Sequence, residues 1–146
     1  MRRLAPLCVG LLACFCGTAT AVRLDAPTYL GELPTVTAIS VVPSEFAPKT
    51  PEHKGGGTSF RYTVSEAATV RFKIERKKGV RFKKLGSRSK LSVMSGSYGI
   101  AWNGKLHGQP LVAGNYRAVV VATDQAGGQS KPKTVGFRIL PVPPSR

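Results

Sequence analysis

Residues Leu111 to Gly128 read LVAGNYRAVVVATDQAGG and indicate the fold more clearly than any other part of the chain. Its middle part, residues 117–123, consists mainly of β-branched residues and alanine with turn-forming residues on both sides, which is typical of a β-strand. Residues 119–121 are all valine, so this strand is apolar on both faces. A strand of this kind belongs in the centre of a sheet rather than at its edge.

The residues that lead into this strand have a spacing with a physical meaning. Leu111 is followed by Gly114, which lets the chain bend, and then by Tyr116 just inside the strand. A tyrosine at this point can return its hydroxyl to the backbone of the bend, as the tyrosine corner of β-sandwiches does. The stretch therefore predicts a sandwich of two packed sheets.

Strict alternation of apolar and polar residues marks two further strands. Residues 58–65 and 68–76 both place large apolar side chains at every second position. This period of two indicates half-buried antiparallel strands. The apolar positions are Phe60, Tyr62 and Val64 in the first strand, and Val70, Phe72 and Ile74 in the second.

The rest of the chain divides at its turn signals. Lys77-Lys78-Gly79 predicts a hairpin turn, and Asn103-Gly104 predicts another turn. Residues 43–57 hold three prolines and a glycine triplet, so we expect a loop in which Phe46 closes one end of the core. We expect the polar, basic segment 86–94 to be a loop with a short irregular strand. The other predicted strands are 35–42, 80–85, 97–102 and 134–140, which gives about seven strands and no helix.

The first residues have the layout of a secretory signal peptide. Arg2 and Arg3 precede an apolar run over residues 4–16, and small residues follow at Ala19-Thr20-Ala21. The run is too short to span a bilayer comfortably. We therefore expect secretion or location in the cell envelope. The expected division is a signal peptide over 1–21, a linker over 22–34, one domain over 35–140 and a proline-rich tail over 141–146.

The cysteines bear on the anchoring of the mature chain. All three, Cys8, Cys14 and Cys16, lie in the leader, so cleavage after Ala21 would leave neither a disulfide nor a thiolate metal site. The sequence Leu11-Leu-Ala-Cys14 also resembles a bacterial lipobox, in which the cysteine becomes a lipidated N-terminus. A lipoprotein anchored at Cys14 therefore stays open as an alternative.

Basic residues dominate the charge of the chain. Twenty-two Lys and Arg residues against seven Asp and Glu residues give a formal net charge of +15, which favours contact with anionic surfaces. Eight of these cations lie within fifteen residues that contain no acid. They are Arg76, Lys77, Lys78, Arg81, Lys83, Lys84, Arg88 and Lys90.

This basic stretch has two interpretations. Lysines on an edge strand prevent one sheet from pairing with another, so the charges can be a protective, solvated edge. The second hypothesis is that the hairpin contacts an anionic envelope polymer, a phospholipid surface or an acidic protein. Nucleic acid is disfavoured as a partner, because Phe82 is the only aromatic residue in the stretch and the leader directs the chain to export.

Other residue types give no catalytic, cofactor or metal site. His53 and His107 both lie in predicted loops without nearby cysteines or clustered carboxylates, which favours solvated side chains over metal ligands. Asp124 is better placed to bond the backbone of its own turn than to bind Ca²⁺. Tyr98 and Trp102 are expected in the core rather than stacked on a sugar.

Several short motifs together resemble a known family. They are Gly99-Ile-Ala-Trp-Asn-Gly-Lys105, Gly108, Leu111, Gly114-Asn-Tyr116, Ala122-Thr-Asp124 and Ala126-Gly127. This pattern resembles the C-terminal Ig-like module of flagellar hook-capping proteins, which recurs in secreted and cell-surface bacterial proteins. The module more often has Asp where this chain has Asn103, and Asn where it has Gly128, but both replacements suit a turn.

The resemblance implies an all-β fold, an Ig-like or fibronectin-III-like antiparallel β-sandwich, over about residues 35–140. It implies structural roles for Trp102, Gly104, Leu111, Gly114, Tyr116, Asp124 and Gly127. It is nearly silent on function. Only a leader and a linker precede Thr35, so we do not expect a hook-capping role.

The sequence therefore predicts a secreted or envelope-associated interaction module that is not an enzyme. Its expected contacts are the basic hairpin and an anionic polymer or acidic partner. A structural spacer without a specific ligand is the alternative. An extracellular enzyme would require polar residues gathered around a cleft.

Overall fold

The computed structural model describes residues 31–92 and 94–142. The predicted signal peptide, Cys14 and most of the predicted linker and tail lie outside these residues. The described part is all-β, as predicted, and none of its segments is a helix that is long and apolar enough to cross a membrane. Its strands are β1 (Val36–Val42), β2 (Glu45–Phe46), β3 (Thr58–Val64), β4 (Ala68–Lys78), β5 (Arg81–Ser92), β6 (Gly96–Trp102), β7 (Lys105–Leu106), β8 (Gln109–Pro110), β9 (Gly114–Thr123) and β10 (Lys133–Ile139).

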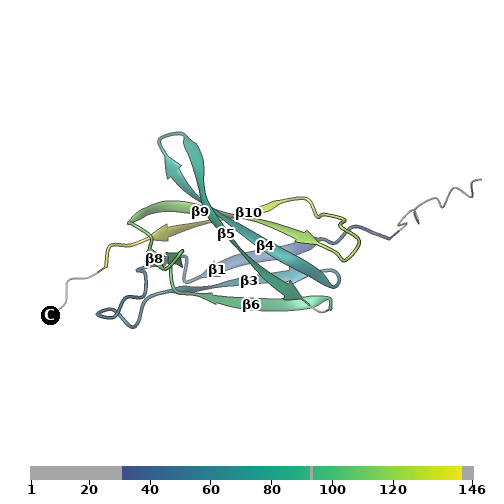
Figure 1. The fold of residues 1–146 in the computed structure, drawn as a ribbon, viewed down its shortest axis with the longest axis horizontal. Helices are drawn as coiled ribbons and strands as arrows, with labels where there is room; N and C mark the ends of the chain where they lie inside the picture. The colour runs from purple at the N-terminus through teal and green to yellow at the C-terminus, as the bar shows by residue number, and fades with distance from the viewer. Residues whose placement is uncertain (1–30, 93, 143–146) are drawn as a thin grey trace, which may run out of the picture.

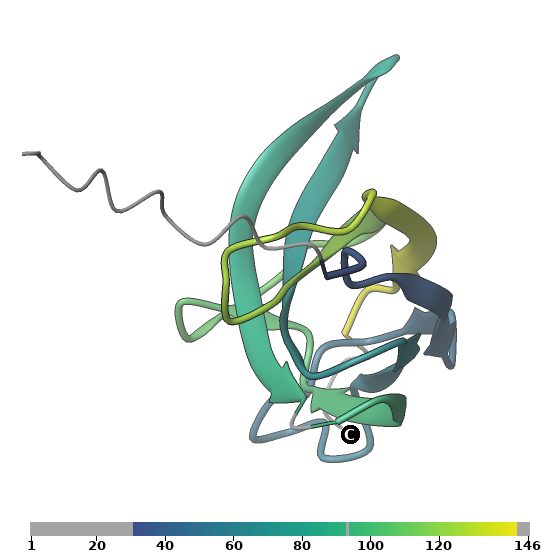
Figure 2. The same cartoon turned by 90° about the vertical axis from the view of Figure 1, so that its right-hand side faces the viewer.

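Two main sheets lie one over the other, in a sandwich-like arrangement (Figures 1 and 2). One has the strand order β1-β3-β6, and the other has the order β2-β10-β9-β4-β5. All pairs in them are antiparallel except β2–β10, which is parallel. A sheet with one apolar face is stable only when that face is covered, and here each sheet covers the other.

Strand β9 occupies the middle of the five-stranded sheet, which confirms the interpretation of residues 117–123. It pairs with β10 on one side and with β4 on the other. Ala118, Val120 and Ala122 are fully buried between the sheets. Val119 and Val121 are half-buried on the outer face.

The core consists largely of aromatic rings supplied by both sheets. The ring of Trp102 on β6 lies 5.5 Å from the ring of Phe60 on β3 and 5.6 Å from that of Phe137 on β10. Phe46 contacts both Trp102 and Phe137 at 5.9 Å and is 4% exposed, so it closes one end of the core as expected. Tyr62 and Phe72 meet at 5.3 Å further along.

Hydrogen bonds fix the bends that lead into and out of β6 and β9. The hydroxyl of Tyr116 donates to the carbonyl of Val112 at 2.7 Å, and the indole of Trp102 donates to the carbonyl of Lys105 at 2.9 Å. Asp124 accepts from the backbone N–H of Gly128 at 2.8 Å. Leu111 packs against the core.

Glycine at two of these bends has a conformational reason. Gly104 and Gly127 have φ angles of +74° and +89°, values that residues with a Cβ rarely adopt. A Cβ at Gly104 would also lie 3.0 Å from the Cα of Pro48.

The prediction of a loop over residues 86–94 was wrong in most of its length. Residues 86–92 continue β5, because they pair with residues 68–74 of β4. Most of this segment is solvent-exposed on the edge of the sheet, so it lacks the apolar alternation that identifies a half-buried strand. Val80 was expected to begin this strand but lies in the turn with Gly79, 95% exposed.

Short strands also occur in the predicted loop over residues 43–57 and after the predicted turn at Asn103-Gly104. Residues 43–57 contain β2, which pairs with Arg138 and Ile139 of β10. Residues 105–112 contain the β7–β8 hairpin, whose turn is formed by His107 and Gly108 with φ angles of +51° and +80°. Pairs of two residues give too short a pattern to detect by periodicity.

Candidate functional site

The β4–β5 hairpin projects beyond the rest of the sandwich (Figures 1 and 2). Strand β9 accompanies β4 only as far as Arg76, which pairs with Tyr116. Beyond that point the two strands of the hairpin pair only with each other and end at the Gly79–Val80 turn. We call residues 77–84 the tip, in which Lys83 and Lys84 lie opposite Arg76 and Glu75, where β9 still accompanies β4.

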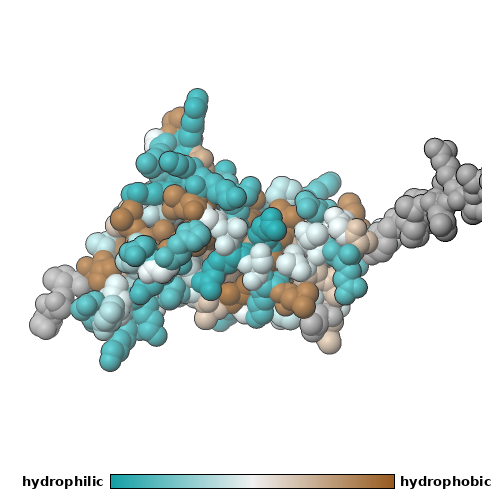
Figure 3. Space-filling view, viewed as in Figure 1, coloured by the Kyte–Doolittle hydropathy of each residue, from teal (hydrophilic) through white to brown (hydrophobic). Residues whose placement is uncertain are grey.

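The tip is densely cationic on both faces of its two-stranded ribbon. In the cross-strand register Lys78 faces Arg81, whereas Lys77 faces Phe82. Hydrophilic side chains cover most of the projection in Figure 3. Five cations of the tip are exposed and form no side-chain hydrogen bond or ion pair with another described residue. They are Lys77, Lys78, Arg81, Lys83 and Lys84.

An ion pair fixes the base of the projection. The guanidinium of Arg117 on β9 donates to the carboxylate of Glu75 on β4, with an Nη2–Oε2 distance of 2.7 Å. The same guanidinium lies 3.9 Å from the ring centroid of Phe82. Arg117 therefore occupies one face of the half-buried Phe82 ring.

Sequence reasoning missed this pair for a physical reason. Glu75 lies on the outer face of the sheet, where its unbroken pairing with β9 places it directly opposite Arg117. It is nevertheless only 9% exposed, because the side chain of Arg117 lies against it. Its partner, Arg117, lies 42 residues away in the sequence, so no local pattern could indicate the contact.

Three of the eight predicted contact residues lie apart from the tip. Arg76 donates to the carbonyl of Ala113 at 3.2 Å and lies over the ring of Tyr116, so it stabilises the bend before β9. The ammonium of Lys90 donates to the carbonyl of Gly99 on β6 at 3.0 Å. Arg88 lines a pocket beside Trp102 and Asn103.

The position of β5 supports the edge interpretation as well. It is the last strand of its sheet, and its charged residues can prevent pairing with another sheet. Lys90 also satisfies a backbone carbonyl on β6. Edge protection accounts well for Arg88 and Lys90. It accounts less well for the tip, where cations occupy both faces of a ribbon that extends past the sheet.

The other candidate residues are not gathered into a site. Within residues 31–92 and 94–142, no group of three or more His, Cys, Asp or Glu side chains could hold a metal ion. Trp102 is 2% exposed and its N–H is already bonded, so it offers no platform for a sugar. Tyr98 is half-buried against Tyr62 and bonds the backbone of Met94.

Comparisons with known proteins give no assignment. No model of a known protein family matches the sequence, and no curated protein matches it significantly.

Proposed function

We propose that this protein is a non-enzymatic, secreted or envelope-associated interaction module whose hairpin tip contacts an anionic polymer or an acidic partner. The observation that supports the proposal most strongly is the set of five exposed cations on a projection that extends past the sandwich. Their fields add, because no acidic side chain of the described residues forms an ion pair with them.

We further propose that the fold is Ig-like. The hydrogen bond from Tyr116 to Val112, four residues before it, has the form of a tyrosine corner. The motifs from Gly99 to Gly127 that resemble the hook-capping module lie in β6, in β9 and at the bends beside these strands. Secretion is proposed from the leader pattern alone.

An anionic polymer suits the shape of the tip better than a flat surface does. The ribbon presents cations on both of its faces, and a flexible chain can follow both faces at once. A membrane would contact one face of the ribbon, and the cations on the other face would then have no anionic partner. Binding should therefore be electrostatic, with little apolar burial, and should weaken steeply as salt is added.

A structural spacer remains the second candidate function, and one observation favours it. The described chain enters β1 and leaves β10 at opposite ends of the long axis (Figure 1). This arrangement would let the domain separate two neighbouring segments. A pull-down from envelope extract distinguishes the two functions, because a spacer should retain nothing in a salt-sensitive manner.

A salt titration tests the proposed function. Binding to sodium polygalacturonate, a polyuronate, is measured between low and physiological ionic strength. The proposal predicts a loss of affinity that follows the number of neutralised cations. Affinity that does not depend on salt would contradict it.

A further inference from the structure

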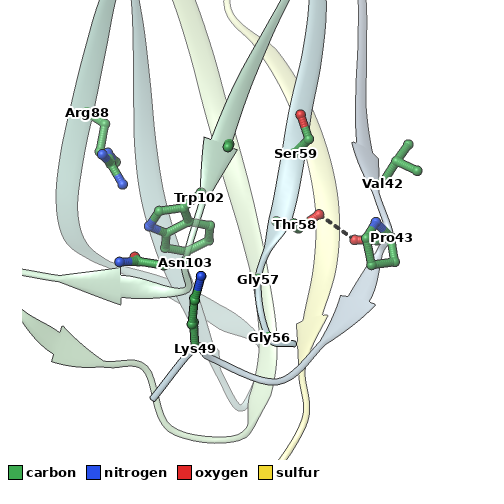
Figure 4. A pocket seen from close by; sticks show the side chains of 11 residues that line it. Val42, Pro43, Lys49, Gly56, Gly57, Thr58, Ser59, Arg88, Trp102 and Asn103 are labelled. Carbon is green, nitrogen blue, oxygen red and sulfur yellow. Dashed lines mark hydrogen bonds between the residues drawn. The ribbon is translucent and has the colours of Figure 1, made fainter. Parts of the chain in front are cut away.

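A pocket beside Trp102 is lined by two cationic side chains that have no role in the proposed function. It lies at the end of the sandwich where β6 finishes, beside the loop over residues 43–57, and has a volume of about 460 Å³. Lys49 comes from that loop and Arg88 from β5. Figure 4 shows these two side chains reaching toward Trp102 and Asn103 from different sides.

The charged groups that line this pocket have one sign. Lys49 and Arg88 are both exposed, and neither forms a side-chain hydrogen bond or ion pair within the described residues. No acidic residue lines the pocket. Two cations beside a concave wall attract an anion more strongly than isolated surface lysines do, because the wall excludes part of the screening water.

The hydrogen-bonding direction of Asn103 agrees with this charge. Its side-chain oxygen already accepts the backbone N–H of Lys105 at 3.1 Å, so the amide nitrogen is the group left to donate. The pocket therefore offers an ammonium, a guanidinium and an amide N–H, all of which are donors. An oxyanion is the ligand class that accepts from such a set.

A neighbouring hollow extends the positive surface. It shares Arg88 and Asn103 with the pocket and adds Lys105 and His107. Glu52 is exposed on the loop and lines neither hollow. The pKa of Glu52 is lowered by hydrogen bonds with its own backbone and with Thr50, and to a smaller extent by Lys105.

We propose that this pocket binds one oxyanion group, a carboxylate, phosphate or sulfate, through Lys49, Arg88 and Asn103. The inference goes beyond the proposed function, because it concerns a small anion and uses none of the five tip cations. A free solute or a charged group on a polymer would meet the same three donors.

The only tryptophan of the chain makes the test direct. Trp102 lines the pocket, so its fluorescence reports on occupancy there and not at the tip. The full mature chain is titrated separately with glucuronate, inorganic phosphate and sulfate, with chloride at equal ionic strength as the reference. Saturation by glucuronate alone would indicate a sugar acid, and saturation by phosphate or sulfate would indicate an ester group. The proposal predicts a saturable change that chloride does not produce.

Single substitutions in the pocket test whether the fluorescence change comes from an anion bound there. Arg88→Ala and Lys49→Ala should each weaken binding roughly tenfold, the factor for losing one charge-assisted hydrogen bond. Lys131→Ala removes the same charge from an exposed site outside the pocket and should leave affinity unchanged. Both pocket side chains are exposed, so folding should survive, and circular dichroism checks this.

The result of the small-anion titration can be distinguished from the result of polymer binding by the tip. Reversing the tip charges should leave the small-anion titration intact, whether or not the tip binds polymer. A fluorescence response equal to that of chloride, or equal affinity in wild type, Arg88→Ala and Lys49→Ala, would overturn the proposal.

Discussion

The guanidinium of Arg117 holds the carboxylate of Glu75 at 2.7 Å where the hairpin leaves the sheet. The side chain of Glu75 is 11% exposed, and that of Arg117 is 36% exposed. This pair divides the basic hairpin into an anchored base and a free tip. It also removes an acid, Glu75, from the charge that the tip presents to a partner.

Arg117→Ala should destabilise the fold by about 1–3 kcal/mol. The substitution leaves a largely buried carboxylate without its partner, and an unpaired buried charge costs more than the pair contributes. Urea unfolding measures the change. Arg138→Ala, which removes an exposed cation from the neighbouring strand β10, is the control and should change stability by less than about 0.5 kcal/mol. Equal stability of wild type and Arg117→Ala would show that the pair does not anchor the hairpin.

Tyr116→Phe should lower stability by about 1 kcal/mol, because the carbonyl of Val112 loses its 2.7 Å partner. In a domain of this size the melting temperature should fall by about 4–8 °C. Val112→Ala keeps the carbonyl and removes only an exposed side chain, so its melting temperature should match that of wild type. An unchanged melting temperature for Tyr116→Phe would show that the hydrogen bond from Tyr116 to Val112 does not stabilise the fold.

Alkaline pH should destabilise the protein through two tyrosines. Burial raises the pKa of Tyr62 and of Tyr116 above the ordinary value of 10.0. Above about pH 10 the unfolded chain releases these protons while the native state keeps them, so the free energy of unfolding falls as pH rises. Below about pH 9 this contribution is fully present.

The double variant Tyr62→Phe, Tyr116→Phe isolates this effect. We expect it to be less stable than wild type at neutral pH, because both hydroxyls lose their hydrogen bonds. It should, however, lose less stability between about pH 8 and pH 11. Denaturant unfolding across this range gives the comparison. Identical pH slopes for the variant and wild type would mean that other groups govern the alkaline transition.

The strands that could be predicted from the sequence are those with a buried face. Residues 60–64 and 70–74 alternate because every second side chain enters the core, and residues 118–122 of β9 are apolar on both faces because the strand is central. The far half of β5 gave no such signal. Among residues 87–92 only Ser92 is buried, and it bonds the hydroxyl of Tyr62. The other side chains face solvent, so most of them are polar or charged without a period of two.

The candidate site could also be predicted only in part from the sequence. The cluster of cations is a local feature and could be read directly from residues 76–90. Which of them remain free depends on long-range contacts, such as that of Arg76 with Ala113 and that of Lys90 with Gly99. Lys49 lies in a loop with no basic cluster, so only the fold could place it beside Arg88.

Charge reversal at the tip tests whether the tip is the contact surface. The tip variant replaces Lys77, Lys78, Arg81 and Lys83 with Glu and spares Lys84, whose cross-strand neighbour is Glu75. A matched control replaces four exposed cations elsewhere with Glu, namely Lys54, Arg61, Lys131 and Arg138. Both variants have the same net charge, and circular dichroism confirms that each is folded.

Affinity for sodium polygalacturonate at low salt is then compared among the three proteins. We predict that the tip variant loses nearly all binding while the control keeps most of it, because the proposed contact is local and not a result of net charge. Wild-type affinity in the tip variant, or an equal loss in both variants, would contradict the assignment of the tip as the contact surface.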